Sequence, residues 1–173
     1  MGSLLIQEVN EKDQLQGNPD AAIELVEYGD YQCPHCGRAY PIIKKIQKAL
    51  GNNIKFVFRN FPLSNMHPDA ASAAAAAEAA GVQGKFWEMH DTIFEHQNKL
   101  SEDDLYLYAE KLGLNVEQFQ NDMLSEKIIS KIEDDFESGM RSGVNGTPSF
   151  FVNGEKYSND WEYEPFLGFL KSL

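Results

Sequence analysis

The sequence has few basic residues, no long apolar run and very little cysteine. It carries 15 lysines and arginines against 27 aspartates and glutamates, which gives a formal net charge of −12. So acidic a surface repels nucleic acid and anionic membranes, and we expect neither as a partner. No apolar run approaches the roughly 18 residues that a membrane-spanning helix needs, so we expect no membrane span.

The N-terminal segment also lacks the features of an export signal. Met1 to Glu8 contain no basic start, no long apolar stretch and no small-residue cleavage site. We therefore expect a cytoplasmic location for the chain as it stands. If a signal peptide has been removed from its N-terminus, the expected location is periplasmic or exported.

The two cysteines of the chain lie close together, in Cys33-Pro34-His35-Cys36. An apolar, strand-like run from Ile23 to Tyr28 precedes them, and apolar residues at helical spacing follow from Ile42 to Leu50. The pair therefore lies where a strand ends and a helix begins. A Cys-x-x-Cys at such a junction is typical of a redox-active thiol pair.

This placement suggests a role for each residue of the motif. Unpaired N–H groups at a helix start favour an anion, so we expect Cys33 to be a thiolate with a lowered pKa. Cys36, one turn further in, is the expected resolving thiol. Pro34 fits the first turn because it has no N–H to leave unpaired. His35 can donate to the thiolate or place positive charge beside it.

A Cys-x-x-Cys can also be half of a zinc site, or an inert pair of structural cysteines. Zinc needs about four ligands, and His67, His90 and His96 lack a compact ligand spacing. We therefore predict no metal site and no cofactor. We interpret the three histidines as structural, with His67 the best placed to lie near the cysteines.

The order of elements predicts an α/β protein. The strand at 23–28, the helix at 33–50 and a strand at 54–61 form a right-handed strand–helix–strand unit. Helical patterns fill residues 63–130, and a strand hairpin and a final helix end the chain. We therefore predict one domain formed by residues 1–62 and 131–173, interrupted by an all-helical insertion at 63–130.

Glu27 is an anomaly in the first predicted strand. By strand alternation it shares a face with Ile23 and Leu25, which predicts a buried carboxyl close to the cysteine pair. Burial would raise its pKa and make it a candidate proton relay for Cys36. The alternative is a position at the sheet edge that reaches water.

The segment Gly146-Thr147-Pro148 completes a set of motifs that resembles the DsbA-like family of thioredoxin-fold proteins. The other members of the set are Cys33-Pro34-His35-Cys36, Glu27 and the helical insertion, and the resemblance spans about residues 17–173. Asp30–Cys36 and Arg59–Leu63 are similar to a smaller bacterial subgroup, some of it fused to sodium/proton antiporters.

The resemblance implies a thioredoxin fold with an all-helical insertion between the second strand and the C-terminal ββα unit. It implies a cis Thr147–Pro148 bond beside Cys33, with Thr147 and Pro148 binding an extended substrate. The implied activity is thiol–disulfide exchange with thiol- or disulfide-containing proteins, acting as an oxidant. A redox recycling partner and a monomeric state are expected with it.

Two other functions remain open. One is a cytosolic disulfide reductase or isomerase, which runs the same chemistry in the opposite direction. The other is a non-catalytic binding module that uses the same fold. The redox poise of the compartment would distinguish a reductase or isomerase from an oxidant. Metal analysis and a disulfide-reduction assay would distinguish a non-catalytic binding module from an enzyme.

Overall fold

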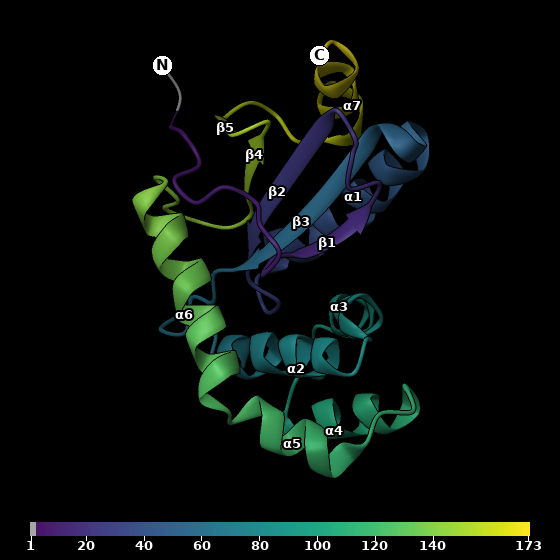
Figure 1. The fold of residues 1–173 in the computed structure, drawn as a ribbon, viewed down its shortest axis with the longest axis vertical. Helices are drawn as coiled ribbons and strands as arrows, with labels where there is room; N and C mark the ends of the chain where they lie inside the picture. The colour runs from purple at the N-terminus through teal and green to yellow at the C-terminus, as the bar shows by residue number, and fades with distance from the viewer. Residues whose placement is uncertain (1–2) are drawn as a thin grey trace.

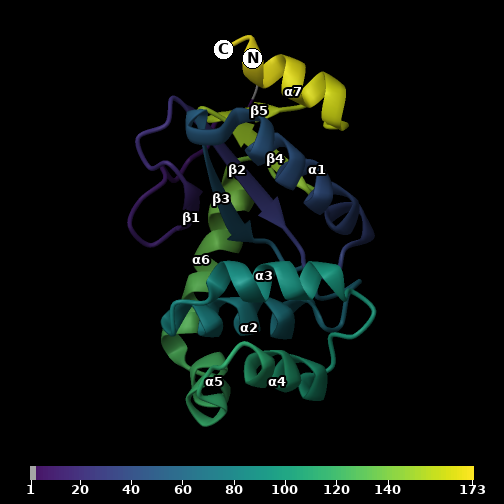
Figure 2. The ribbon, with the colours of Figure 1, turned by 90° about the vertical axis from the view of Figure 1, so that its right-hand side faces the viewer.

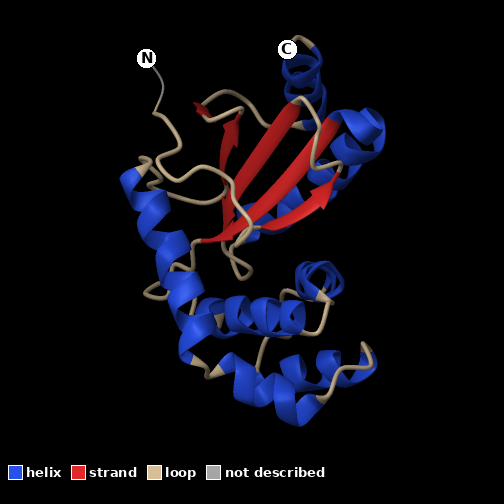
Figure 3. Ribbon diagram, in the orientation of Figure 1, coloured by secondary structure: helices blue, strands red, loops and turns tan. Residues whose placement is uncertain are grey.

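The computed structural model describes residues 3–173 as one five-stranded sheet surrounded by helices (Figures 1 and 3). The strands follow the spatial order β1–β3–β2–β4–β5. β2 and β3 are parallel, and the other neighbouring pairs in the sheet are antiparallel. The strand bounds are β1 Gln14–Gly17, β2 Ile23–Gly29, β3 Ile54–Asn60, β4 Ser149–Val152 and β5 Glu155–Tyr157.

The helices form two groups. α1 and α7 cover one face of the sheet and α6 runs along the other, while α2 to α5 stack beyond the carboxyl ends of β2 and β3 (Figures 1 and 2). The helix bounds are α1 Pro34–Leu50, α2 Ala70–Val82, α3 Phe86–Glu95, α4 Glu102–Lys111, α5 Val116–Met123, α6 Glu126–Arg141 and α7 Tyr163–Lys171.

Alternation along β2 divides the core between the two faces of the sheet. Leu25 belongs to the larger apolar cluster, which includes residues of α1 and α7, whereas Val26 and Tyr28 belong to a smaller cluster. Phe136 of α6 stacks on Phe61 in the smaller cluster, with ring centroids 4.3 Å apart. The central strand is therefore buried on both faces, as strands between two helical layers are.

The predicted α/β class is confirmed, with its strand–helix–strand start and its helices between β3 and β4. The division at residues 130 and 131 stays a prediction, and α6 runs without interruption across that point. Within residues 3–173, no helix has the length and apolar character needed to cross a membrane.

Local signals explain where several elements begin and turn. Ser101 and Asp104 form a reciprocal capping box at the start of α4, and the Ser125 side chain accepts a hydrogen bond at the start of α6. Asn153 and Gly154 both have positive φ, at 48° and 85°, in the turn between β4 and β5. Both conformations suit the predicted Asn-Gly hairpin turn.

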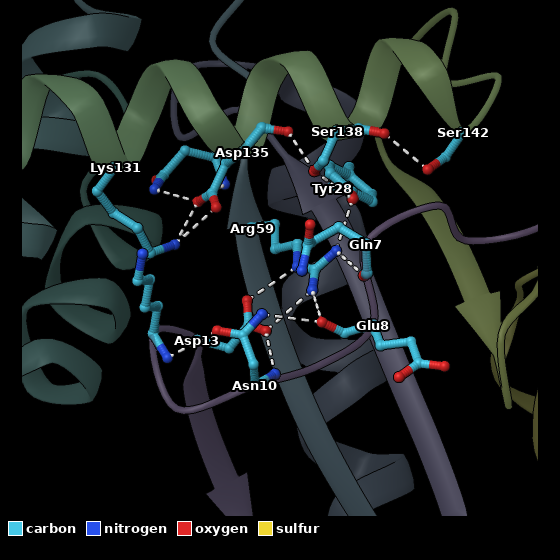
Figure 4. A network of polar contacts seen from close by, with 12 residues as sticks. Gln7, Glu8, Asn10, Asp13, Tyr28, Arg59, Lys131, Asp135, Ser138 and Ser142 are labelled. Atoms are coloured by element: carbon cyan, nitrogen blue, oxygen red, sulfur yellow. Dashed lines mark hydrogen bonds and ion pairs between the residues drawn. The ribbon is translucent and has the colours of Figure 1, made fainter.

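A buried polar network ties the N-terminal segment to the sheet (Figure 4). The guanidinium of Arg59 on β3 donates to both carboxylate oxygens of Asp13, at 2.8 and 2.9 Å. It also donates to the carbonyls of Gln7 and Glu8 and to the hydroxyl of Tyr28. Because the Arg59 side chain is only 2% exposed, these partners replace the water that its charge would otherwise bind.

Candidate active site

The two cysteines lie at the start of α1, directly after the carboxyl end of β2. Cys33 is the N-cap residue of α1, and Pro34 is the first residue of the helix. The turn from β2 is closed by the Cys33 N–H, which donates to the Asp30 carbonyl at 3.1 Å. Both cysteines are unbridged thiols and buried, whereas Pro34 and His35 are exposed. The strand-to-helix junction predicted for the pair is confirmed.

The surroundings of Cys33 lower the pKa of its thiol to about 5. The largest cause is a hydrogen bond from the Cys36 thiol; the Thr147 side chain and the backbone N–H groups of Cys36 and His35 add to it, against the effect of burial. His35 is exposed, and its backbone N–H is among the groups that lower the pKa of Cys33. The contribution expected of the His35 ring stays a prediction.

Cys36 differs from Cys33 in its surroundings. Its side chain is fully buried, and burial raises the pKa of its thiol well above the usual value. The hydrogen bond to Cys33 and the charge of Glu27 raise it further. Near neutral pH the pair therefore consists of an ionised Cys33 and a protonated Cys36. Such a pair combines a good leaving group with a thiol that needs a base before it can attack.

Glu27 is buried, as predicted, with only 3% of its surface exposed. Burial, and then the charge of Cys33, raises the pKa of its carboxyl to about 8. Glu27 Oε2 has no hydrogen-bond partner in the described chain. The residue borders a cavity of about 10 Å³. That volume suits one water molecule, which a carboxyl group without a partner can bind.

The loop before β4 lies against Cys33. The Thr147–Pro148 peptide bond is cis. Cys33 Sγ lies 3.7 Å from the Thr147 carbonyl oxygen, to which its protonated form can donate. The Thr147 hydroxyl is buried and has no hydrogen-bond partner within residues 3–173. The structure therefore brings together Cys33 and the two residues predicted to bind substrate, although their roles stay predictions.

Asp30 is a residue of this site that the sequence did not single out. Its backbone N–H lies 3.5 Å from Cys36 Sγ, and its carboxylate accepts hydrogen bonds from the N–H groups of Gln32 and Leu63. His67 completes the set, with its Nδ1 2.7 Å from Asp30 Oδ2. No local pattern marks this aspartate as buried, because Leu63 and His67, which hold its second carboxylate oxygen, lie 33 and 37 residues along the chain.

The other two histidines lie away from the thiols. His90 of α3 is buried, and its Nδ1 is 2.9 Å from the hydroxyl of Tyr31. Burial, with the charge of Lys44, lowers the pKa of His90 well below its usual value, so its ring is neutral. His96 is exposed after α3. Across residues 3–173, no three His, Cys, Asp or Glu side chains cluster so as to hold a metal ion.

Comparison with known families gives a match over nearly the whole chain. The family model described as "Thioredoxin" matches residues 9–172. Among curated proteins, the chain is 41% identical over 165 residues to a Na(+)/H(+) antiporter NhaA 1 of Mycobacterium sp. strain KMS. It is also 41% identical over 154 residues to the NhaA 1 protein of Salinispora arenicola. These matches cover 94% and 89% of the chain but only 27% and 24% of the relatives, so the chain spans about a quarter of their length.

Solved structures give the same fold. A thioredoxin-like oxidoreductase from Silicibacter pomeroyi superposes with a TM-score of 0.85 at 29% identity, covering 94% of this chain and 92% of its own. BdbD from Bacillus subtilis superposes with a TM-score of 0.85 at 24% identity, covering 99% and 98%. Wolbachia pipientis alpha-DsbA1 follows with a TM-score of 0.83 at 22% identity, covering 98% and 94%. The predicted thioredoxin fold is therefore confirmed.

Proposed function

The chain belongs to the thioredoxin family, and on that premise we propose that it exchanges disulfides with protein substrates through Cys33 and Cys36. The observation that carries the proposal is the difference between the two thiols. The pKa of Cys33 is lowered to about 5, while that of Cys36 is raised well above its usual value. Cys33 is thus a good leaving group as a thiolate, and Cys36 stays a protonated thiol near neutral pH. A solved thioredoxin-like oxidoreductase at 29% identity supports the same reaction class.

The proposed reaction starts from the Cys33–Cys36 disulfide. A substrate thiolate attacks Cys33 Sγ, a mixed disulfide forms, and Cys36 leaves as the sulfur that must take up a proton. A second substrate thiolate then attacks the substrate sulfur of the mixed disulfide and expels Cys33. The substrate gains a disulfide, and the protein gains the two electrons as a pair of thiols. Oxidation of those thiols by a redox partner restores the starting state.

Glu27 is the proposed proton relay for Cys36. Its pKa of about 8 keeps the carboxyl largely protonated near neutral pH, so it can supply a proton when Cys36 leaves. In the reverse direction its carboxylate can take the proton when Cys36 attacks a mixed disulfide. The cavity of about 10 Å³ that Glu27 borders has room for one water bound to its carboxyl, although neither cysteine lines that cavity.

We propose the oxidising direction because a stabilised Cys33 thiolate favours the reduced form of the pair. A pair whose reduced form is favoured passes its disulfide on to other thiols. The expected substrates are proteins with two free thiols. The contact of Cys33 with Thr147 puts the loop before β4 at the edge of the reacting sulfur, where an extended substrate segment could pair with it.

The test is equilibration of the pair with glutathione, followed by oxidation of a reduced model substrate. An oxidant should have a potential nearer to about −120 mV, the value of DsbA, than to about −270 mV, the value of thioredoxin. Cys33→Ser should abolish exchange. Cys36→Ser, which cannot form the internal disulfide, should instead accumulate a mixed disulfide between Cys33 and glutathione when oxidised glutathione is supplied. A potential near that of thioredoxin would favour the reductase alternative. If the wild-type pair did not exchange with any dithiol, the proposed activity would be wrong.

A further inference from the structure

We propose that Gln97, in the helical insertion, is a positioning residue for the thiol pair, because its side-chain amide fixes the backbone turn that aims Cys33 at the start of α1. The role of Gln97 in disulfide exchange rests on the proposed function. The evidence that Gln97 positions Cys33 does not, because it consists of the contacts of the Gln97 side chain. Gln97 lies after the end of α3 and more than 60 residues along the chain from the cysteines.

The amide nitrogen of Gln97 donates two hydrogen bonds to the turn. Nε2 lies 2.9 Å from the carbonyl oxygen of Tyr31 and 2.9 Å from that of Cys33. These two bonds use both N–H groups of the amide. The Cys33 carbonyl also accepts the Gly37 N–H at 3.0 Å, the first turn of α1. Gln97 therefore bonds to the same carbonyl that starts the helix.

Gly37 leaves the space in which the Gln97 amide lies. A Cβ atom at position 37 would come 2.0 Å from Gln97 Oε1 and 2.6 Å from its Cδ. Such distances exclude any side chain while the amide stays in place. The glycine directly after the Cys-x-x-Cys thus leaves room for the side chain of Gln97, which follows α3.

The turn matters because the thiolate of Cys33 depends on directional contacts. The sulfur is stabilised by the Cys36 thiol, the Thr147 side chain and the N–H groups of the first turn. Hydrogen bonds weaken steeply when their angle changes, so a turn that moves more freely holds the sulfur less well. Without Gln97, the Tyr31 carbonyl would bond to water, and the Cys33 carbonyl would keep only the Gly37 N–H as a partner in the described chain.

The contact of His90 with the turn does not replace that of Gln97. The Tyr31 hydroxyl meets His90 Nδ1 at 2.9 Å, which holds the end of a side chain and not the carbonyls of the turn. Gln97 contacts the backbone on both sides of residue 32.

The test is titration of Cys33 in the full-length reduced protein by the ultraviolet absorbance of its thiolate. Gln97→Ala should raise the midpoint by about 0.7 pH units, the equivalent of one net hydrogen bond. The equilibrium with glutathione should move about five-fold toward the protein disulfide for the same reason. Gln97→Glu, which keeps the size but cannot donate, should raise the midpoint at least as much.

Two further variants separate positioning from general destabilisation. Gln83→Ala is the matched control, because Gln83 also exchanges two hydrogen bonds with backbone, those of Asn115, far from the thiols. It should lower stability without moving the Cys33 midpoint. Gly37→Ala should raise the midpoint in the wild type, and it should add little in a Gln97→Ala background, where no amide is displaced.

An unchanged midpoint in both Gln97 variants would overturn the inference, and so would an equal shift in the Gln83 control. The titration needs no substrate, so it decides this point even if the protein exchanges no disulfides. Conversely, a shifted midpoint in a protein that proved inactive would overturn only the proposed function.

Discussion

His67 Nδ1 lies 2.7 Å from Oδ2 of Asp30, and this contact joins the segment before α2 to the turn that carries both cysteines. The side chain of Asp30 is fully buried. Its backbone meets both thiol residues, through the Cys33 N–H at its carbonyl and through its own N–H at Cys36 Sγ. Asp30 thus links the segment after β3 to both thiol residues.

Replacing Asp30 by alanine should destabilise the protein by about 2–4 kcal/mol, because three buried or half-buried donors lose their acceptor. Those donors are Gln32 N–H, Leu63 N–H and His67 Nδ1. Denaturant unfolding of the oxidised protein measures the loss. Asp69→Ala is a suitable control, since Asp69 accepts one long bond of 3.4 Å from Gln32, and it should cost about 1 kcal/mol or less. Equal losses in the two variants would contradict the role given to Asp30.

The second prediction concerns the contact that most lowers the pKa of Cys33. In the reduced wild type the thiolate should form with a midpoint near pH 5. Cys36→Ala should raise that midpoint by about 1–2 pH units, because a hydrogen bond to a charged sulfur is lost. Cys36→Ser keeps a donor and should stay closer to the wild type. Alkylation rate against pH gives the three midpoints, and equal midpoints for the alanine and serine variants would refute the assignment.

The third prediction follows from the raised pKa of Glu27, from 4.5 to about 8. A carboxyl whose pKa is higher in the folded state stabilises the fold below its unfolded pKa, and that contribution is lost as pH rises through the folded value. In the oxidised protein Cys33 carries no charge, and burial alone raises the pKa of Glu27. The oxidised wild type should therefore lose stability relative to Glu27→Gln as pH rises above about 4.5, by up to about 1.4 kcal/mol per pH unit. Melts at several pH values test this, and a constant difference as pH rises would show that Glu27 is not held protonated.

The reduced protein should show the opposite trend from its thiolate. The Cys33 pKa falls from 9.0 to about 5 on folding, so its contribution is complete above pH 9 and disappears as pH falls to about 5. The stability of the reduced form relative to the oxidised form should therefore rise with pH across that window. A difference that fell or stayed level from pH 5 to 9 would count against a stabilised thiolate.

The fifth prediction concerns the buried hydroxyl of Thr147. Thr147→Val replaces a hydroxyl that has no hydrogen-bond partner within the described chain by a methyl group of similar size. Loss of an unpaired polar group is close to neutral, so the oxidised protein should keep its stability within about 1 kcal/mol. Although the Thr147 hydroxyl makes no hydrogen bond within residues 3–173 in the thiol form of the site, the Thr147 side chain favours the thiolate, so the pKa of Cys33 should rise. Thr147→Ser is the control that keeps the hydroxyl. An unchanged Cys33 pKa in the valine variant would show that the Thr147 side chain does not lower it.

The features predicted correctly from sequence are those that short-range patterns specify. The apolar run at Ile23–Tyr28 and the helical spacing from Ile42 to Leu50 locate the thiol pair at a strand–helix junction. Strand alternation alone predicts the burial of Glu27. Each signal comes from residues within one element, where periodicity decides which side faces the core.

The features missed are contacts between residues far apart in the chain. Asp30, Gln97 and Gly37 belong to a turn, a loop and a helix, and no spacing rule relates them. The sequence also did not indicate the part of the Cys36 thiol in lowering the Cys33 pKa, which is the largest cause, ahead of the backbone N–H groups of Cys36 and His35 at the helix start. Such effects depend on the distances and orientations of side chains, which the folded chain alone provides.

The bonds of Arg59 determine how short this protein can be made. Its guanidinium is held by Asp13 and by the carbonyls of Gln7 and Glu8, all of them before β1. A version trimmed to begin at the first strand would keep every residue of the sheet and leave a buried cation without its carboxylate. Losing one partner of a buried ion pair costs about 3–5 kcal/mol, a large part of the stability of a small domain. A minimal version of the protein must therefore begin no later than Gln7.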